Sequence, residues 1–471
     1  MLADRGRHRK VHSRPRFPET ARRILLKVES LEERVPLAGD FGFANAFGAS
    51  GEDLARTLAI DAAGNSYIAG EFRQTVDFDP GSGITSLTAS GEIDAFVAKY
   101  SPTGALLWVQ AFGSTGLDWA TDVALDPAGN VWLVGRHAGT VDFDNGIGVA
   151  NKTGVNGYGA FILKLTSEGA FQWVGTIDGQ LAALTVDRAG NVFATGQYAG
   201  TRDFDPGPGT FTLTSEQNTA DAFLVKLDNN GGFLWAKSWG GNALYFNGDT
   251  AVDVAVDQDG NAYVTGEFMG VADLDPAETI LSVTTSGSHD MYVSKFDPDG
   301  NLTWARVMDG YAWPQSIAID SQANVYITGE LQTSTDFDPG PGSNILSAIS
   351  GGIDVFVSKI DTDGNYVWAR NFGRTNTNFG FGITTDSNDD VYIAGQVSGT
   401  NADLDPGPGV FPLSTAGGVD IFVSRLSSSG QFLGATTLGG PTAHVRSLSI
   451  QRRGTFTSPG NFRALSISIR Q

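Results

Sequence analysis

Short apolar runs separated by polar turn residues occupy most of the chain. The runs are rich in Val, Ile, Phe, Tyr and Trp and are bounded by Gly, Pro, Asn and Asp, which is typical of β-strands joined by tight turns. Between Asp40 and Ile450 no stretch shows a convincing helical period. In the first unit the pattern predicts strands at residues 57–60, 66–72, 94–100 and 106–112, with the last strand outermost.

The same pattern returns six times with a period of about 65 residues. The residue that opens the second strand is Asn65, Asn130, Asn191, Asn261, Asn324 and Asp390, so the steps are 65, 61, 70, 63 and 66 residues. This regular spacing excludes independent domains joined by linkers, and each unit is longer than the roughly 20–45 residues of a short solenoid repeat. Four-stranded antiparallel sheets at regular spacing predict an all-β fold, a β-propeller. A row of β-sandwiches is the alternative, but it would usually need more residues per unit.

Both ends of the repeat region resemble part of a unit. Residues 41–48 resemble the last strand of a unit, such as 106–113, and residues 446–450 resemble a first strand. We therefore predict a propeller domain at 39–450, with six complete repeats and an incomplete seventh blade shared by the two ends.

Two strings of residues recur in the units. One is Asp-x-x-Gly-Asn-x-Tyr-x-x-Gly, at 61–70 and 257–266, and the other is Asp-Ala-Phe-Val-x-Lys, at 94–99, with a close variant at 221–226. With these strings, residues 40–450 resemble the bacterial β-propeller repeat family (SBBP-type repeats) of seven-bladed propellers in exported proteins. The resemblance implies the fold and export, but no particular activity, since propellers of one shape serve many functions. The departures from the strings are Gly159 for Asp, Arg425 for Lys, and Asp389-Asp390 for Gly-Asn.

A tryptophan also recurs, four residues after a glycine turn. Its copies are Trp108, Trp173, Trp235, Trp304 and Trp368. We expect each ring to pack between adjacent blades, because aromatic side chains dominate core energetics. Stacking on a sugar is the alternative. The sixth unit has Gly434 at this position, which predicts weaker packing against its neighbour.

Charge is distributed unevenly along the chain. The formal net charge is −21, residues 1–35 carry +5 and residues 451–471 carry +4, so the middle carries −21 − 5 − 4 = −30. An acidic body argues against a nucleic-acid partner. The chain has no cysteine, which excludes disulfides and thiol chemistry. No apolar run is long enough for a transmembrane segment.

The segment at residues 1–38 is basic and separate from the repeats. Apolar residues within 22–35 form a helical stripe that Pro36 ends. Residues 31–38, Leu-Glu-Glu-Arg-Val-Pro-Leu-Ala, resemble a segment near the start of many large bacterial surface proteins. We therefore expect an export region that directs the protein to the cell surface or the extracellular space. A basic disordered arm is the alternative.

The tail at residues 451–471 breaks the repeat pattern, with four Arg and no acidic residue. Read one base out of frame, its codons permit Asn-Val-Tyr-Ile-Thr-Gly followed by Asp-Phe-Asp-Pro, which is the sequence of the repeat itself. We expect a one-base slip near the codon for Gln451, and a native protein that completes the seventh blade.

Every unit carries an Asp-x-Asp pair. The pairs are Asp77/Asp79, Asp142/Asp144, Asp203/Asp205, Asp273/Asp275, Asp336/Asp338 and Asp403/Asp405. Residues two apart in extended chain point the same way, so each pair presents two carboxylates, which are hard oxygen ligands suited to Ca²⁺. Asp before Pro-Gly is also an ordinary turn signature. We favour the turn and keep these residues as candidate calcium ligands.

Candidate catalytic residues are few. The five histidines do not repeat, so a hydrolase triad or a histidine metal site is poorly supported, and we expect each histidine in a surface or loop position. We favour a non-enzymatic exported scaffold that binds a protein, glycan or cation through blade loops. The alternative is an enzyme with a central-channel site, either a lyase or similar to quinoprotein dehydrogenases, whose tryptophan motif the Gly-x-x-x-Trp string resembles. The non-repeated Arg136, His137, His289 and Trp313 are the positions where such a site would differ from the repeat.

Overall fold

The protein is described from a computed structural model of the chain. The structure describes residues 53–438, except 217–218, 242–247, 278–280, 374–376, 400–401 and 414–418. Strands make up nearly all of the regular structure in this part, together with the 3-10 turn η2 (Ile349–Gly351). None of the helical structure found there is long and apolar enough to cross a membrane.

The strands form six successive antiparallel sets of four, which we call sheets one to six. Sheet one contains β1 (Leu54–Ile60), β2 (Ser66–Phe72), β5 (Asp94–Tyr100) and β6 (Leu106–Phe112). Sheet two contains β7 (Trp119–Leu125), β8 (Val131–Asp142), β9 (Asn151–Leu165) and β10 (Phe171–Ile177). Sheet three contains β11 (Gln180–Val186), β12 (Val192–Ala199), β15 (Ala220–Leu227) and β16 (Phe233–Gly241).

The long strand β22 (Leu302–Ile319) belongs to two sheets. Its first half completes sheet four, after β17 (Thr250–Val256), β18 (Ala262–Phe268) and β21 (Asp290–Phe296). Its second half begins sheet five, before β23 (Val325–Asp336), β25 (Asp354–Ile360) and β26 (Tyr366–Phe372). Sheet six contains β27 (Phe379–Thr385), β28 (Val391–Ser398), β31 (Val419–Leu426) and β32 (Phe432–Leu438).

A small hairpin follows the second strand of each sheet. The separate hairpins are β3 (Thr75–Asp77) with β4 (Ser86–Thr88), β13 (Thr201–Asp203) with β14 (Thr212–Thr214), β19 (Val271–Asp273) with β20 (Ser282–Thr284), and β29 (Ala402–Asp403) with β30 (Pro412–Leu413). In sheet two the hairpin is continuous with β8 and β9, and in sheet five the end of β23 pairs with β24 (Ile345–Ser347).

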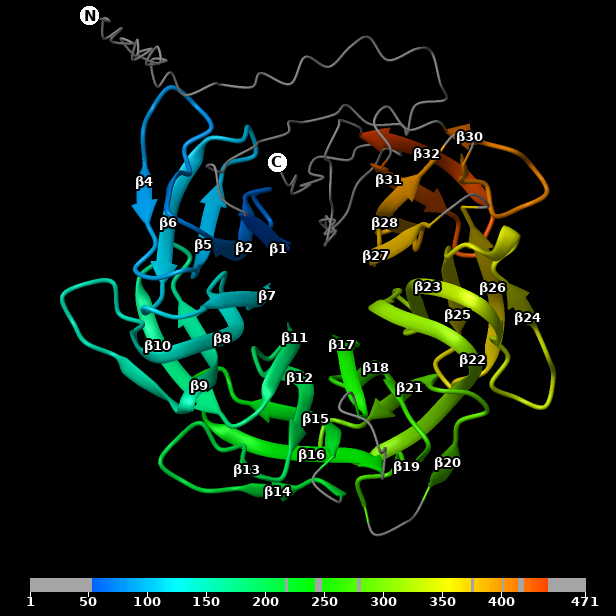
Figure 1. Cartoon of the computed structure of the whole chain (residues 1–471), viewed down its shortest axis with the longest axis horizontal. Coiled ribbons are helices and arrows are strands. Elements are labelled where there is room, and N and C mark those ends of the chain that lie inside the picture. Colours follow the sequence, from blue (N-terminus) through cyan, green and yellow to red (C-terminus); the bar gives the residue numbers. More distant parts are fainter. Residues whose placement is uncertain are drawn as a thin grey trace, which may run out of the picture. The chain divides into compact units, whose positions relative to one another are not determined.

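The sheets follow one another around a common centre, as in a propeller (Figure 1). The first strand of each sheet is innermost, and these inner strands contact one another in the order β1, β7, β11, β17, the second half of β22, and β27. The predicted all-β, propeller-like arrangement is therefore confirmed. The expected seventh blade, the domain boundaries at 38 and 450 and the tail lie outside the described residues, so they stay predictions.

The strand predictions for the first unit are correct with one exception. The second, third and fourth strands have the predicted bounds, and the fourth is outermost. The first strand begins at Leu54 rather than Thr57, because the register with β2 shifts between Ala55 and Thr57. This bulge interrupts the alternation of side chains that the sequence pattern relies on.

The hydrophobic core lies between neighbouring sheets rather than within one. All of β5 is buried, as expected for a strand covered on both faces. One core cluster joins Tyr67 and Val97 of sheet one with Leu133 and Phe161 of sheet two, and each of these side chains is fully buried. Each sheet thus depends on the next one for the burial of its apolar surface.

The turn between the first two strands is closed by one aspartate. The Asp61 Oδ1 atom accepts hydrogen bonds from the N–H groups of Ala63 and Asn65, at 3.0 and 2.8 Å. Its Oδ2 atom accepts from Asn65 Nδ2 and from the Tyr67 hydroxyl. Gly64 has a φ of 87°, a conformation that favours glycine. The recurrent Asp-x-x-Gly-Asn-x-Tyr string is therefore a single turn with its side-chain caps.

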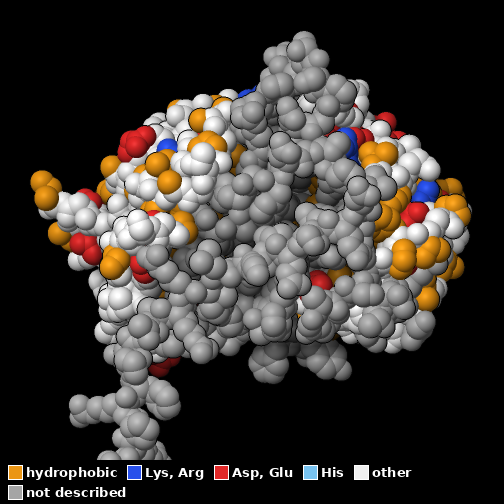
Figure 2. All heavy atoms as spheres, turned by 90° about the horizontal axis from the view of Figure 1, so that it is seen from above, with side chains coloured by type: hydrophobic (Ala, Val, Ile, Leu, Met, Phe, Trp, Pro, Cys, Tyr) orange, Lys and Arg blue, Asp and Glu red, His pale blue; other side chains and the backbone are white. Residues whose placement is uncertain are grey.

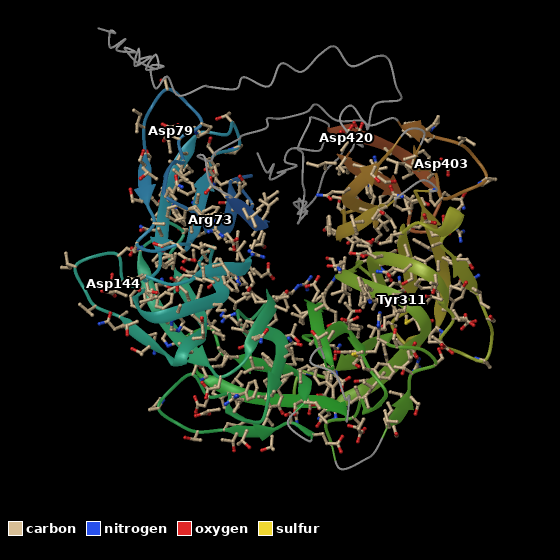
Figure 3. All side chains as sticks on the ribbon, viewed as in Figure 1. Arg73, Asp79, Asp144, Tyr311, Asp403 and Asp420 are labelled. Carbon is tan, nitrogen blue, oxygen red and sulfur yellow. The ribbon has the colours of Figure 1, made fainter. Side chains whose placement is uncertain are left out.

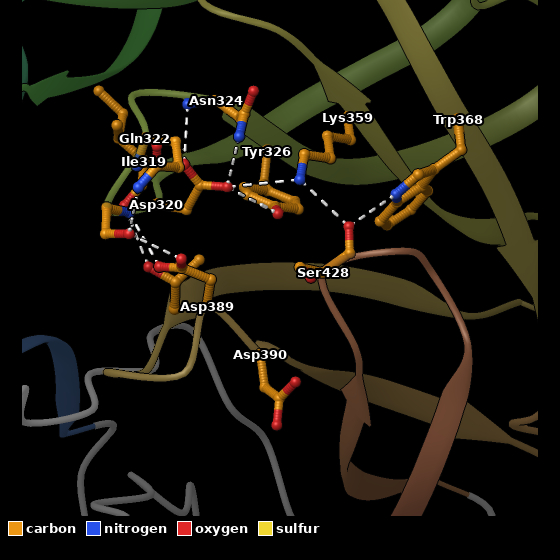
Figure 4. Close-up of polar contacts among 12 residues, drawn as sticks. Ile319, Asp320, Gln322, Asn324, Tyr326, Lys359, Trp368, Asp389, Asp390 and Ser428 are labelled. Carbon is orange, nitrogen blue, oxygen red and sulfur yellow. Dashed lines mark hydrogen bonds and ion pairs between the residues drawn. The ribbon is translucent and has the colours of Figure 1, made fainter.

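A lysine and a tryptophan of one sheet bind the same carbonyl of the next sheet. In Figure 4, Lys359 Nζ and Trp368 Nε1 both donate to the Ser428 carbonyl oxygen, each at 3.1 Å. The Trp368 ring covers Gly430, where an added Cβ would lie 2.9 Å from the indole. We call this contact the inter-sheet clamp. It confirms the predicted packing of the tryptophans between blades.

The clamp recurs at the other seams between described sheets. Lys99 and Trp108 donate to Ser167 O, Lys226 and Trp235 to Pro298 O, Lys295 and Trp304 to Thr362 O, and Lys164 donates to Asn229 O, where the Trp173 ring covers Gly231.

The departures of the sixth unit compensate one another. Arg425, in the lysine position, forms an ion pair with Asp390 at 2.6 Å, and Asp390 stands where the other units have Asn. Asp389 takes the place of the turn glycine, with a φ of 61°, and accepts hydrogen bonds from Ser321 of sheet five. The weaker packing expected from Gly434 concerns the far side of this sheet and stays a prediction.

We predict that Trp368→Ala lowers the free energy of unfolding by about 3–5 kcal/mol, the usual cost of truncating a buried aromatic residue. Val367→Ala is the matched control, since Val367 precedes Trp368 on β26 and is 44% exposed. It should change the stability by no more than about 0.5 kcal/mol. Urea unfolding followed by tryptophan fluorescence measures both, and equal effects of the two substitutions would contradict the role of the clamp.

Candidate functional site at the inner rim

The Asp-x-Asp pairs lie on the small hairpins, and Asp79 and Asp144 are seen at the outer edge (Figure 3). The Asp77 Oδ1 atom accepts hydrogen bonds from the N–H groups of Asp79 and Thr85, at 3.1 and 2.9 Å. The Asp79 Oδ1 atom accepts from Gly81 N at 2.7 Å. One oxygen of each carboxylate is therefore engaged in closing the hairpin loop.

All six pairs share this geometry. The first Asp of a pair accepts from the N–H groups two and eight residues later, as seen at Asp77, Asp142, Asp203, Asp273, Asp336 and Asp403. The second Asp accepts from the N–H group two residues later, as seen at Asp79, Asp144, Asp205, Asp275, Asp338 and Asp405. These bonds support the turn interpretation.

The structure does not assemble the candidate calcium ligands into a metal site. Within the described ranges, no three acidic, histidine or cysteine side chains are grouped as metal ligands. Each hairpin therefore offers its own two carboxylates without a third acidic partner in the described chain, and this holds for all twelve residues: Asp77 with Asp79, Asp142 with Asp144, Asp203 with Asp205, Asp273 with Asp275, Asp336 with Asp338, and Asp403 with Asp405. Two carboxylates fall short of the six to eight oxygen ligands that Ca²⁺ takes, so the turn stays our favoured interpretation and calcium binding at these pairs stays the untested alternative.

The residues that differ between units gather at one end of the inner strands. We define the inner rim as the residue six positions before the end of each inner strand, which is the first residue of the strand except in the long β22, together with the residue paired to it on the second strand. The pairs are Leu54/Glu71, Trp119/Arg136, Gln180/Gln197, Thr250/Glu267, Trp313/Glu330 and Phe379/Gln396. At the opposite end, the paired residues are Ile60/Ser66, Leu125/Val131, Val186/Val192, Val256/Ala262, Ile319/Val325 and Thr385/Val391, which are mostly aliphatic.

A stack of arginines and aromatic rings occupies the rim of sheets one and two. The Arg136 guanidinium lies 5.1 Å from the centroid of a Trp119 ring and 4.2 Å from that of Tyr158. Arg56 lies 5.8 Å from a Trp119 ring centroid and forms an ion pair with Glu71 at 2.7 Å. We call these five residues the arginine stack. Cations over aromatic faces are attracted by the ring quadrupole, so the stack holds its guanidinium groups in place.

A histidine cluster joins the rims of sheets four and five. Trp313 Nε1 donates a hydrogen bond to His289 Nε2, and the His289 and Trp313 rings are stacked. Ser288 Oγ lies 3.3 Å from His289 Nδ1, and the Tyr311 ring centroid is 4.2 Å from that of His289. A Glu267 carboxylate oxygen lies 3.8 Å from His289 Nε2. Both ring nitrogens of His289 thus have partners.

Burial changes the ionisation of the histidine cluster. It lowers the pKa of His289, which agrees with an uncharged ring whose Nε2 accepts from Trp313. Burial, with the nearby Asp249 charge, raises the pKa of Glu267 to about 7. Burial, and to a smaller extent the Glu267 charge, raise the pKa of Glu330 to about 7. The cluster therefore changes its charge near neutral pH.

The structure corrects the expectation of a surface or loop position for one histidine, His137, while His289 does lie in a loop. His137 is fully buried on β8 and His289 is 6% exposed, so neither is a surface residue. His137 takes the space beside Gly159, where an added Cβ would lie 2.5 Å from His137 Nε2. The glycine that replaces Asp in this unit thus makes room for the imidazole. Burial lowers the pKa of His137 to about 4.

Of the four non-repeated residues, the structure brings two together. His289 and Trp313 are in contact, Arg136 belongs to the arginine stack, and His137 is a core residue. Sequence reasoning missed Trp119, Tyr158, Tyr311, Glu267 and Glu330. A comparison of the inner-rim positions across the units would have identified Trp119 and also Glu267, the strand partner of Thr250.

Comparisons with known proteins place the chain among repeat proteins without assigning a family. No protein-family model matches it. An uncharacterized WD repeat-containing protein, L264, of Acanthamoeba polyphaga mimivirus is 24% identical over 420 residues, which cover 72% of this chain and 30% of that protein. The regulatory protein FlaEY of Caulobacter vibrioides is 26% identical over 320 residues, covering 62% of this chain and 31% of that protein. The chain spans about a third of the length of these curated relatives.

Solved structures show weaker similarity. A protein of unknown function from Bacteroides caccae has a TM-score of 0.36 and 11% identity, with 75% of this chain and 93% of that chain covered. BamB from Moraxella catarrhalis has a TM-score of 0.36 and 14% identity, with 84% and 94% covered.

We predict that Asp336→Asn leaves the unfolding midpoint nearly unchanged, because Asn keeps the Oδ1 acceptor. Asp336→Ala should lower the midpoint, because it removes two loop hydrogen bonds worth about 1 kcal/mol each. Addition of a chelator should not shift the midpoint of the wild type. A lower midpoint in chelator, absent from the Asn variant, would instead establish these residues as calcium ligands.

We also predict that the protein becomes more stable as the pH falls from about 8 to about 6. Burial raises the pKa of six carboxyl groups to about 6 or 7: Asp122, Asp221, Asp249, Asp253, Glu267 and Glu330. The folded state therefore holds protons that the unfolded chain releases. This stabilisation is fully present below the unfolded pKa near 4 and is lost as the pH rises through about 7.

Thermal unfolding across this pH range checks the prediction. Glu330→Gln should reduce the slope of the midpoint against pH, and Glu168→Gln, at an exposed position, should not. Burial lowers the pKa of His137 and His289, so below about pH 6.5 these two residues reduce the stability of the fold as the pH falls. We expect the effect of six carboxyl groups to exceed that of two imidazoles. A midpoint that falls with acidification in this range would show that the carboxyl groups are ionised in the folded state.

Proposed function

We propose that this chain is a non-enzymatic, exported β-propeller that binds a protein ligand at its inner rim. The observation that carries the proposal is the distribution of the residues that differ between units. The turns and hairpins are nearly the same in every described sheet, and the clamps are nearly the same at the five seams between them, whereas the inner rim presents a different pair of side chains in each sheet. Structural positions in a repeat need the same residues, so a position that varies is free to serve recognition.

The composition of the inner rim supports protein recognition. Trp, Tyr and Arg dominate the energetics of protein interfaces, and all three occur in the arginine stack. On the side of the molecule seen in Figure 2, the visible apolar side chains of the described residues lie next to polar and charged ones. Single exposed residues such as Ile84, Ile147 and Val410 on the hairpins are ordinary for a protein surface.

The wider proposal includes membership of the SBBP-type repeat family, seven blades and export. It rests on the recurrent strings, on the strand-like segments at 41–48 and 446–450, and on the basic segment at 1–38. Two relatives described as a WD repeat-containing protein and a regulatory protein agree with a repeat scaffold. We do not propose catalysis at His289, because Trp313 and Ser288 engage both of its ring nitrogens.

Selection from a phage-displayed library of short random peptides tests the proposal. We expect the immobilised chain to enrich peptides, and Trp313→Ala to raise their Kd by about 30-fold, as for an aromatic hot spot. Leu107→Ala and Leu234→Ala are matched controls on the outer strands, where these residues are 52% and 48% exposed. They should leave the Kd unchanged.

Two results would refute the proposal. One is the absence of any enriched peptide. The other is a set of peptides that bind the Trp313→Ala variant and the two leucine variants equally well, since such peptides would not use the inner rim. Melting curves for all variants separate a loss of binding from a loss of folding.

A further inference from the structure

The guanidinium of Arg136 lies over the rings of two aromatic residues. Its carbon atom is 5.1 Å from the centroid of a Trp119 ring and 4.2 Å from that of Tyr158. Stacking uses the faces of a guanidinium and leaves the N–H groups around its edge for hydrogen bonds. Within the described part of the chain, no carboxylate or carbonyl oxygen accepts a hydrogen bond from Arg136.

Other arginines in the structure do have acceptors. Arg56 is paired with Glu71, Arg306 donates to the carbonyl oxygens of Asp363 and Gly364, and Arg425 is paired with Asp390. Among the described residues, the side chains of Arg73, Arg188 and Arg202 lack an oxygen acceptor as Arg136 does, but Arg136 alone among the described arginines has two aromatic rings beside its guanidinium. The acid of the arginine stack, Glu71, does not pair with Arg136, because it is already bound by both Nε and a terminal nitrogen of Arg56.

The position of Arg136 favours ligand binding over solvation alone. The side chain is half-buried, so its rotamers are restricted before a ligand arrives, and less entropy is lost on binding. Tyr158 is 50% exposed, which leaves aromatic surface beside the guanidinium for the ligand to contact. A planar fork of N–H donors matches the two oxygens of a carboxylate.

The negative charge of the chain favours a ligand with one isolated carboxylate over a polyanion. The middle of the chain carries a net charge of −30, which repels polyanions at a distance. A single acidic group escapes most of this repulsion because salt screens charges farther apart than about 8 Å at physiological ionic strength. Across the rim, Glu267 and Glu330 would disfavour a carboxylate, so the arginine stack is the side that receives it.

We infer that Arg136 is a carboxylate-binding residue, which receives one Asp or Glu side chain, or the C-terminal carboxylate, of a peptide ligand seated on the inner rim. The inference rests on the proposed function and adds the chemistry of the ligand. Arg136 donates two N–H groups to the carboxylate, and Trp119 and Tyr158 hold the guanidinium in position.

The test uses the library-selected peptides, resynthesised with each Asp or Glu replaced by its amide and, separately, with an amidated C-terminus. Arg136→Gln should raise the Kd of the parent peptide by about 10- to 100-fold, the range for a hydrogen bond to a charged group. Arg136→Lys keeps the charge but not the planar fork, and should lose part of this factor. Arg188→Gln removes one positive charge from an exposed turn at the other end of sheet three and should have little effect.

A double-mutant cycle identifies the contact. Neutralising the relevant carboxylate should weaken binding to the wild type by the same factor, yet should not weaken binding to Arg136→Gln further. If a side-chain amide weakens binding, the carboxylate belongs to an Asp or Glu of the peptide. If the C-terminal amide weakens binding, the carboxylate is the C-terminus of the peptide.

Three outcomes decide between this inference and the proposed function. If peptides depend on Trp313 but tolerate both neutralised acids and Arg136→Gln, the inference is overturned and the binding role of the rim remains. If no peptide depends on the rim, both are overturned. A cycle in which the two losses simply add would show that Arg136 and the carboxylate do not interact, which also overturns the contact.

Discussion

The inter-sheet clamp fixes how each sheet sits against the next, and the other features of the fold follow from it. A single carbonyl oxygen, such as that of Ser428, accepts from both a lysine and a tryptophan of the preceding sheet. The tryptophan ring then covers the glycine of the same turn, at a distance that no Cβ would tolerate without a shift. Since each apolar sheet needs the next for burial, the clamp sets both the spacing and the rotation between neighbours. Lys, Trp and the turn glycine recur together because they form one contact.

Two departures from the repeat sequence are each matched by a second change nearby. Arg425 replaces a clamp lysine, and its positive charge finds Asp390, which has replaced an asparagine of the same sheet. Gly159 replaces an aspartate in sheet two, and the imidazole of His137 takes the vacated space. In each case a change of volume or charge at one position is matched at another, so the local packing and charge balance are retained.

The clamps, turns and hairpins stabilise the fold, so few side chains of the inner rim are needed for its structure. Its strand pairs are held by backbone hydrogen bonds whichever side chains they carry, so aromatic and charged residues are accepted there. Burial changes the ionisation of these residues, because it raises the pKa of Glu267 and Glu330 towards neutrality and lowers that of His289. The stacked Arg136 keeps its N–H groups available beside these clusters. The rim therefore combines a rigid scaffold with side chains that the scaffold does not require.

The strands, the turns and the period could be predicted from the amino-acid sequence, because these features depend on residues close together in the chain. The Asp61 turn involves partners no more than six residues away, and the Asp77 loop closes over eight. The inter-blade tryptophans were predictable too, since a large ring recurring after a glycine indicates a repeated contact. Which non-repeated residues meet could be seen only in the folded structure. His289 reaches Trp313 across a seam between sheets, and Arg136 reaches Trp119 through strand pairing, while His137 turns into the core. Periodicity identifies equivalent positions, but the contacts of a side chain depend on the packing of neighbouring sheets, which the repeat pattern does not contain.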